Sequence, residues 1–325
     1  MVSSLSQKFS DTDPRLRLLN PEAAVFRVEL EPSGEKGKEI RGVFAILPGD
    51  HPNFHRIVTI SYSNFWNRAI RKIVRKSYPE AMPVFFKQNE IRDVLRKFES
   101  TLGPRSRIRV SEVTMKRKSG RDSTISKRFE TDRLWTELSI EQVFELARER
   151  NQWFTSIQIQ IQQIPERSTQ FRTIATGRIY KYGELNYDYL HREVNLSLVS
   201  NLEGYASDRL TLLQGRGIRD RGYRHGLPIE IMYDRNIFEK KEEIQRFASV
   251  ISDYPNSTKA VFHSNPYYHA SVADFLDGSS FEVWILSPQR VLIVPQAKAS
   301  ERAFERLIGH IFFEFREGEI NEYSR

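Results

Sequence analysis

The chain contains no cysteine and no long apolar run. Its 325 residues include 0 Cys, which excludes disulfide bonds and every zinc or iron–sulfur site that depends on thiolate ligands. No stretch approaches the ~18 consecutive apolar residues of a membrane-spanning helix. Residues 1–19, MVSSLSQKFSDTDPRLRLL, also lack the apolar core that a signal peptide needs. We therefore expect a cytoplasmic protein with no membrane partner.

The composition is that of a folded, basic protein. Hydrophobic residues make up 39% and charged residues 28% of the chain, a balance that is not typical of disorder. Lys and Arg total 50 against 42 Asp and Glu, which leaves a net charge of +8. This excess favours nucleic acid or another anionic surface as the partner. The alternative is an ordinary basic protein that binds nothing acidic.

Apolar periodicity predicts an α+β fold with mixed sheets and packed helices. At 325 residues the chain exceeds one average domain, and we expect two. Residues 1–23 are predicted to be a tail or irregular arm, because Pro14 and Pro21 break them. A basic α+β domain is then expected at 24–167 and a second α+β domain at 168–325. A continuous sheet that crosses the boundary near 165–169 is the alternative.

The first domain is predicted to contain a hairpin, further strands and three helices. Strands are expected at residues 25–30, 40–47, 57–60 and 157–162, and helices at 65–76, 90–102 and 140–150. The most regular pattern is the Ile and Gln alternation at 157–162, which is typical of a half-buried strand. Ser139 and Gln142 match a capping box at the start of the third helix.

The helix expected at 65–76 is amphipathic and contains no acidic residue. Its apolar face predicts ordinary docking onto a core. The basic remainder, which includes Lys72 and Arg75, is a candidate for contact with a phosphate backbone.

Residues 105–128 hold most of the excess charge, with nine basic and two acidic residues. The start of this segment alternates between apolar and polar residues, Ser119-Gly120 can form a turn in its middle, and Thr124-Ile125-Ser126 can return as a partner strand. These features predict a basic β-ribbon or a basic loop between two strands. Such a density of charge favours a polyanion, because each neutralised phosphate releases counterions. The candidate nucleic-acid contacts in this ribbon are Arg109, Lys116, Arg117, Lys118 and Arg121.

A second basic feature is the Gly-Arg loop at residues 214–226, QGRGIRDRGYRHG. Glycines allow the backbone to approach an anion, and arginines offer forked donors that suit phosphates. The candidate contacts are Arg216, Arg219, Arg221 and Arg224, with Tyr223 as a stacking face. The alternative is a solvated loop whose arginines pair with carboxylates.

The second domain is predicted to end in a helix, three strands and a helix. Strands are expected at 171–180, 194–198, 259–263, 281–286 and 291–294, and helices at 237–251, 272–276 and 300–315. The C-terminal order resembles the core of restriction-endonuclease-like nucleases. On that resemblance Asp277 and Glu282 would hold Mg²⁺, and Gln296 and Lys298 would end the catalytic strand, with Gln296 where the family has an acid.

Taken together, the sequence predicts a protein that binds RNA or single-stranded DNA by its phosphate backbone through the ribbon and the Gly-Arg loop, with no cofactor. A Mg²⁺-dependent nuclease and a protein-interaction subunit of a larger assembly remain alternatives. The 21 Phe and 13 Tyr would supply the apolar surface that a protein partner needs.

Overall fold

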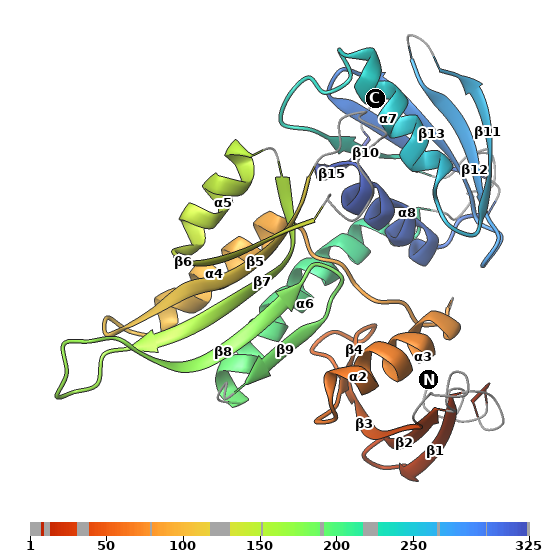
Figure 1. Cartoon of the computed structure of the whole chain (residues 1–325). Helices are drawn as coiled ribbons and strands as arrows, with labels where there is room; N and C mark the ends of the chain where they lie inside the picture. Colours follow the sequence, from red (N-terminus) through yellow and green to blue (C-terminus); the bar gives the residue numbers. More distant parts are fainter. Residues whose placement is uncertain are drawn as a thin grey trace. The chain divides into compact units, whose positions relative to one another are not determined.

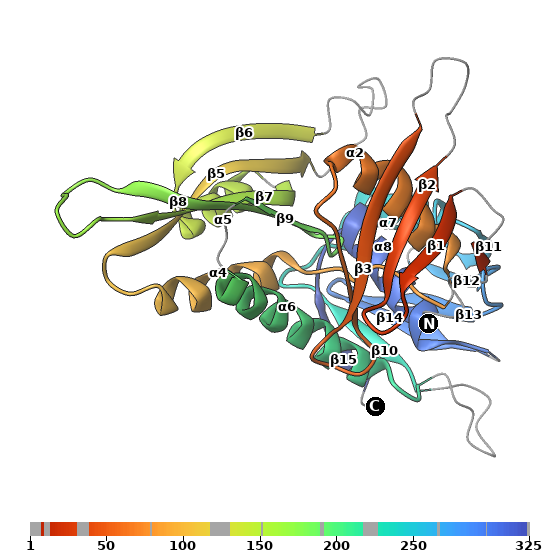
Figure 2. The ribbon, with the colours of Figure 1, turned by 90° about the horizontal axis from the view of Figure 1, so that it is seen from below.

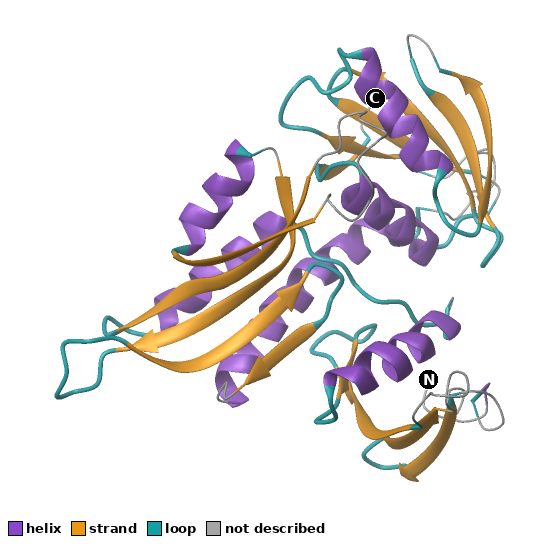
Figure 3. Cartoon of the chain, in the orientation of Figure 1, coloured by secondary structure: helices purple, strands orange, loops and turns teal. Residues whose placement is uncertain are grey.

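The computed structural model describes residues 8–9, 14–30, 39–78, 80–117, 131–150, 152–188, 192–216, 227–264, 267–296 and 298–323. Helices account for 31% and strands for 38%, so the expected α+β class is confirmed (Figure 3). The chain divides into two compact units, Met1–Pro83 and Val84–Arg325 (Figure 1).

The N-terminal unit is built on a four-stranded antiparallel sheet. Its strands follow chain order and are β1 (Arg15–Asn20), β2 (Val25–Leu30), β3 (Ile40–Pro48) and β4 (His55–Val58). The predicted tail is wrong for residues 15–20, which form β1. Pro14 and Pro21 flank this strand instead of interrupting it, and Leu16 enters the core with 5% exposure.

One helical segment covers the inner face of this sheet. The predicted helix at 65–76 is confirmed as α2 (Ser63–Phe65), the π-helical η1 (Trp66–Ile70) and α3 (Arg71–Lys76). Its buried side chains, which include Phe65, Ile70 and Ile73, join one core with Phe26 and Phe44 of the sheet. The helical segment therefore packs on the sheet through its apolar face, as its sequence pattern predicted.

The C-terminal unit begins with a five-stranded antiparallel sheet in the order β6-β5-β7-β8-β9. The strands are β5 (Ser106–Arg117), β6 (Thr131–Leu138), β7 (Gln152–Gln163), β8 (Arg172–Tyr180) and β9 (Leu185–Asp188), and the helices are α4 (Gln88–Thr101), α5 (Ile140–Glu149) and α6 (Arg192–Leu213). The Ser139 and Gln142 capping box is confirmed by reciprocal side-chain hydrogen bonds of 3.3 and 2.9 Å. The 165–169 segment joins β7 to β8, which pair in this sheet.

Helix α6 replaces the strand predicted at residues 194–198. The short alternation there is part of a 22-residue helix. Leu198, Leu202, Ala206 and Leu213 are buried at helical spacing along it, and this longer period outweighs five residues that also fit a strand.

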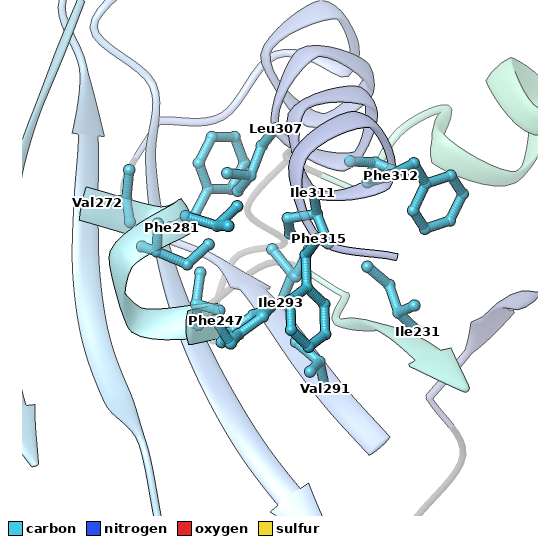
Figure 4. Close-up of a cluster of buried hydrophobic side chains, with 14 of the residues drawn as sticks. Ile231, Phe247, Val272, Phe281, Val291, Ile293, Leu307, Ile311, Phe312 and Phe315 are labelled. Atoms are coloured by element: carbon cyan, nitrogen blue, oxygen red, sulfur yellow. The ribbon is translucent and has the colours of Figure 1, made fainter. Parts of the chain in front are cut away.

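A six-stranded antiparallel sheet follows, in the order β11-β12-β13-β14-β10-β15. Its strands are β10 (Ile229–Met232), β11 (Ser257–His263), β12 (His269–Asp274), β13 (Ser280–Ser287), β14 (Arg290–Pro295) and β15 (Glu319–Glu322), with helices α7 (Lys241–Ser252) and α8 (Glu301–Glu314). Figure 4 shows side chains from both helices and from the sheet, such as Phe247, Ile311 and Ile293, meeting in one core.

The helix predicted at residues 272–276 is wrong. Residues 269–274 form β12, which pairs with β11 on one side and β13 on the other. Two ladders of backbone hydrogen bonds decide the conformation here, and the alternating burial of Ala270 and Val272 fits a strand. The expected order of helix, three strands and helix is therefore replaced by a helix, four strands and a helix, with β10 and β15 adding to the sheet.

Candidate nucleic-acid interface

The five-stranded sheet has one apolar face and one polar face. Along β7 the isoleucines at 157, 159 and 161 are buried, whereas the glutamines at 158, 160 and 162 are only half-buried, because successive side chains of a strand point to opposite faces. Helix α5 packs on the apolar side, where the rings of Phe144 and Phe154 lie 5.0 Å apart. Figure 2 shows α4 and α6 on one side of the strands.

We call the polar side the open face. Its members come from β5, β6, β7 and β8 and are Arg107, Arg109, Glu112, Arg133, Trp135, Glu137, Gln158, Gln160, Gln162, Thr173 and Arg178. The strand register places Gln158 between Glu112 and Arg178, and it places Gln160 opposite Arg109. The polar side chains therefore form rows that cross the sheet.

A buried carboxylate organises one of these rows. Glu112 is 1% exposed and receives hydrogen bonds from Arg133, at 2.5 and 2.8 Å, while Arg178 lies 2.8 Å from its Oε2 atom. Burial alone would raise the pKa of Glu112, but the hydrogen bonds from Arg133 and Arg178 outweigh it and hold the pKa below its usual value. One carboxylate thus fixes two guanidinium groups whose combined charge exceeds its own.

An exposed indole lies beside this group. Trp135 is 70% exposed, and the guanidinium carbon of Arg133 lies 4.8 Å from its ring centroid. A cation over an aromatic face is attracted by the ring quadrupole, so the ion pair with Glu112 and the contact with Trp135 hold Arg133 in place together. The result is a planar apolar surface next to fixed positive charge.

A second cation and ring lie toward the start of β5. Arg107 donates a 3.0 Å hydrogen bond to Gln162, and its guanidinium carbon lies 3.6 Å from the ring centroid of Phe171, which is 37% exposed. Arg109 is half-buried, and within the described ranges no carboxylate forms an ion pair with Arg107 or Arg109. Guanidinium groups therefore stand at both ends of the open face.

The ribbon residues predicted from sequence divide into three groups. Arg109 lies on the open face. Lys116 forms a 2.7 Å ion pair with Glu314 of α8 and serves the fold. Arg117 ends β5, and its side chain is not among those described, while Lys118 and Arg121 lie outside the described residues. The partner strand of β5 is β6 at Thr131–Leu138; the expected return at 124–126 also lies outside the described residues.

Arg216 is a structural residue, contrary to its expected role as a phosphate contact. It is 6% exposed, forms an ion pair with Glu322 of β15 and donates to the carbonyl oxygens of Leu212 and Pro228. The guanidinium group of Arg216 therefore already has its hydrogen-bond partners. This agrees with the alternative stated above, in which arginines of the loop pair with carboxylates. The other loop candidates, Arg219, Arg221, Tyr223 and Arg224, lie outside the described residues.

The two cations predicted on the N-terminal helix both lie on α3. Arg75 is exposed and Lys72 is half-buried. They belong to the N-terminal unit and are not part of the open face.

The four nuclease candidates lie near β12, β13 and β14. Asp277 accepts from the Ser279 amide at 2.9 Å and from the Ser300 hydroxyl, and Lys298 donates to the Asp277 carbonyl oxygen. Although burial opposes it, hydrogen bonds from Ser300 and Ser279 and the charge of Lys298 lower the pKa of Asp277. The structure thus brings Asp277, in the turn between β12 and β13, next to Lys298, which lies between β14 and α8.

Glu282 and Gln296 have different surroundings. Glu282 accepts a 3.2 Å hydrogen bond from Trp284 and lies 3.4 Å from His269, whose ring stacks on Trp284. The backbone N–H of Gln296 donates to the Ser280 carbonyl oxygen at 2.9 Å. Among the side chains that the structure describes, no group of three or more His, Asp or Glu is arranged to hold a metal ion.

Exposed apolar side chains gather at β11, which is an edge strand. Val261 is 50%, Phe262 61% and Tyr267 58% exposed. This is the kind of surface that the protein-interaction alternative requires.

Sequence reasoning missed several members of the open face, namely Arg107, Arg133, Trp135, Arg178 and the three glutamines. The Ile and Gln pattern in the sequence already separated two faces of β7, but it does not say which cations the neighbouring strands bring to the polar side. The alternating burial of residues 131–138 is a property of the folded sheet, because the sequence TDRLWTEL does not alternate between apolar and polar residues.

The fold and this site define an α+β protein with a cationic open sheet face. Comparisons with protein-family models, with curated proteins and with solved structures give no match. None of the helices in the described part of the chain is long and apolar enough to span a membrane.

Proposed function

We propose that the open face binds single-stranded nucleic acid, RNA or DNA. The observation that carries the proposal is an exposed tryptophan in contact with Arg133, on a sheet face that carries three further arginines. Phosphates would bind the guanidinium groups, and a base would stack on the indole.

The excess of positive charge on the open face supports an anionic ligand. The open face holds Arg107, Arg109, Arg133 and Arg178 against two acids, and one of these, Glu112, is buried beneath its arginine partners. The chain between β5 and β6 adds further basic residues to a protein whose net charge is +8. Guanidinium groups are planar forks that suit bidentate contact with phosphate oxygens.

The exposed ring favours a single strand over a duplex. In a duplex the bases are already stacked on one another, whereas an unpaired base offers its face to an aromatic side chain. The half-buried glutamines of β7, which β5 separates from β6, add donors and acceptors to the open face but no charge. The face therefore suits a ligand that combines phosphates with accessible bases.

Substitution of Trp135 tests the proposal. Stacking on an aromatic side chain contributes about 1–3 kcal/mol per base, so Trp135→Ala should weaken binding of a short labelled single strand about 5- to 150-fold. Fluorescence anisotropy with the full chain measures this, and Trp135→Phe should retain most of the affinity. The matched control is Arg148→Ala, an exposed position on α5, which packs on the other face of the sheet.

Two results would count against the proposal. Binding that is unchanged in both Trp135→Ala and the double variant Arg107→Glu/Arg109→Glu would show that the open face is not used. Equal affinity for a duplex of the same sequence would remove the stacking argument.

A further inference from the structure

The outer face of the N-terminal sheet is also rich in arginine. Alternation along β1, β2 and β3 buries Leu16, Phe26 and Phe44 on the side of the helical segment. The same alternation leaves the arginines of the other side exposed: Arg15, Arg17, Arg27 and Arg41. This face belongs to a different unit from the open face.

Two of these arginines stand directly opposite each other. Arg17 of β1 and Arg27 of β2 are Cα partners in the antiparallel register. Side chains in such a pair have Cβ atoms ~5 Å apart, and like charges there destabilise the sheet. Arg41 has Glu39 at 2.9 Å and Arg15 faces Glu29 in register, but no carboxylate within the described ranges forms an ion pair with Arg17 or Arg27.

The row that contains these arginines continues into exposed apolar groups. Arg27 faces Val43 of β3, which is 38% exposed. The Val43 carbonyl accepts a 2.7 Å hydrogen bond from Thr59, and its amide donates to the Ser61 hydroxyl at 3.4 Å. This segment carries two side chains that stand almost fully in solvent, Ile60 at 101% and Tyr62 at 89% exposure.

We propose that this row and the exposed side chains of the adjacent segment, here named the N-terminal strip (Arg17, Arg27, Val43, Ile60 and Tyr62), form a second contact surface for single-stranded nucleic acid. A phosphate between the opposed guanidinium groups would relieve their repulsion. The exposed phenol ring of Tyr62, in the segment that is hydrogen-bonded to Val43, provides a stacking surface for a base.

The ligand class follows from the groups that these neighbouring segments carry. Two exposed cations lie in register with Val43, and the Val43 backbone is hydrogen-bonded to the segment that carries the exposed ring of Tyr62, so phosphate-binding and base-stacking groups occur on adjacent segments. An anionic membrane is the competing partner for a surface with both Arg and apolar side chains, and the experiment includes it. The proposal goes beyond the open face, because a protein with two such surfaces binds long strands with avidity that short strands do not gain.

The test compares long and short single strands bound by the full chain. We expect Arg17→Glu/Arg27→Glu to weaken binding of a strand of roughly 30 nucleotides at least about tenfold, and to change binding of roughly 8 nucleotides much less. Arg148→Glu/Arg150→Glu alters the net charge equally at exposed positions on and after α5 and should have a small effect on both. Arg17→Lys/Arg27→Lys keeps the charge and should retain most of the affinity.

The outcomes separate this proposal from that for the open face. If Arg17→Glu/Arg27→Glu weakens long-strand binding and Trp135→Ala has no effect, the strip stands and the open-face proposal falls. If only Trp135→Ala weakens binding, the strip proposal falls. It also falls if the strip variant loses binding to phosphatidylserine vesicles while its nucleic-acid affinity is unchanged, because the surface would then be a membrane contact. Circular dichroism confirms that each variant is folded.

Discussion

A single buried arginine joins three helices of the C-terminal unit. Arg209 of α6 is 5% exposed and lies 3.0 and 3.2 Å from the carboxylate oxygens of Glu305 on α8. Its Nη1 atom donates to Glu90 of α4 at 2.9 Å, and its guanidinium carbon lies 4.0 Å from the centroid of the Phe85 ring. Buried carboxylates require such a partner, since an unpaired buried charge is strongly unfavourable.

Substitution of Arg209 by leucine should therefore lower the free energy of unfolding by about 3–5 kcal/mol at neutral pH. The loss should depend on pH. Burial raises the pKa of Glu305, the charge of Arg209 lowers it, and Glu90 raises it, so Arg209→Leu raises it further. A carboxyl group whose folded pKa lies above its unfolded value favours folding at low pH, and this contribution is lost as pH rises through the folded pKa.

Urea unfolding of wild type and Arg209→Leu at pH 5 and pH 8 measures this dependence. The difference between the two proteins should be larger at pH 8, where Glu305 must ionise without its partner. Arg209→Leu/Glu305→Gln is the control, and its pH dependence should be smaller. An equal difference at both pH values would show that lost packing, and not the unpaired carboxylate, accounts for the destabilisation.

Helices and strands with a strong local signal could be predicted from the sequence. The capping box at Ser139 and the alternation of β7 depend only on neighbouring residues, and both are confirmed. Helix α6 and strand β12 were misassigned because their conformation depends on distant partners: the core beneath α6, and β11 and β13 on either side of β12. Local propensity predicts secondary structure poorly where contacts with distant residues determine the conformation.

The residues of the candidate site likewise divide into those that the sequence could predict and those that it could not. Charge density located Arg109 in the sequence, because a cluster of basic residues is visible without a fold. Trp135 could not be found in that way, since its exposure depends on which face of β6 the helices cover. Arg216 was misassigned for a related reason: its partner Glu322 is distant in sequence and becomes adjacent only when β15 joins β10.

Two glycines, one in a strand and one in a helix, should respond in opposite ways to replacement by alanine. At Gly42 of β3 a Cβ atom would lie 2.5 Å from the ring of Phe65, which is 2% exposed. Gly42→Ala should therefore destabilise the N-terminal unit by about 1–3 kcal/mol through overpacking. At Gly204 of α6 a Cβ atom meets nothing within 4 Å, so Gly204→Ala should stabilise by roughly 0.5–1 kcal/mol.

Thermal and urea unfolding of both variants checks the pair. Each substitution adds the same methyl group, so a difference in sign isolates the surroundings of the glycine. If Gly42→Ala is as stable as wild type, the packing of α2 against β3 is looser than the structure indicates.

At the scale of the whole molecule, two units with separate cores present two cationic sheet faces. The buried clusters around Phe26 and around Phe247 belong to the N-terminal and C-terminal units, respectively. In the four-stranded sheet of the N-terminal unit and in the five-stranded sheet of the C-terminal unit, helices cover one face while arginines occupy the other. The net charge of +8 thus partly resides in arginines on sheet faces, exposed in the N-terminal unit and mostly half-buried on the open face, where they can contact a flexible polyanion.

The salt dependence of binding measures how many of these cations meet phosphates. For single strands log K falls with log salt by about 0.7 for each phosphate neutralised, so four open-face arginines predict a slope of about −3 for a short oligonucleotide. Arg107→Ala/Arg109→Ala should reduce the magnitude of that slope by about 1.4, whereas Arg148→Ala/Arg150→Ala should leave it unchanged. A slope near zero in the wild type would mean that the arginines do not contact phosphate, however tightly the strand binds.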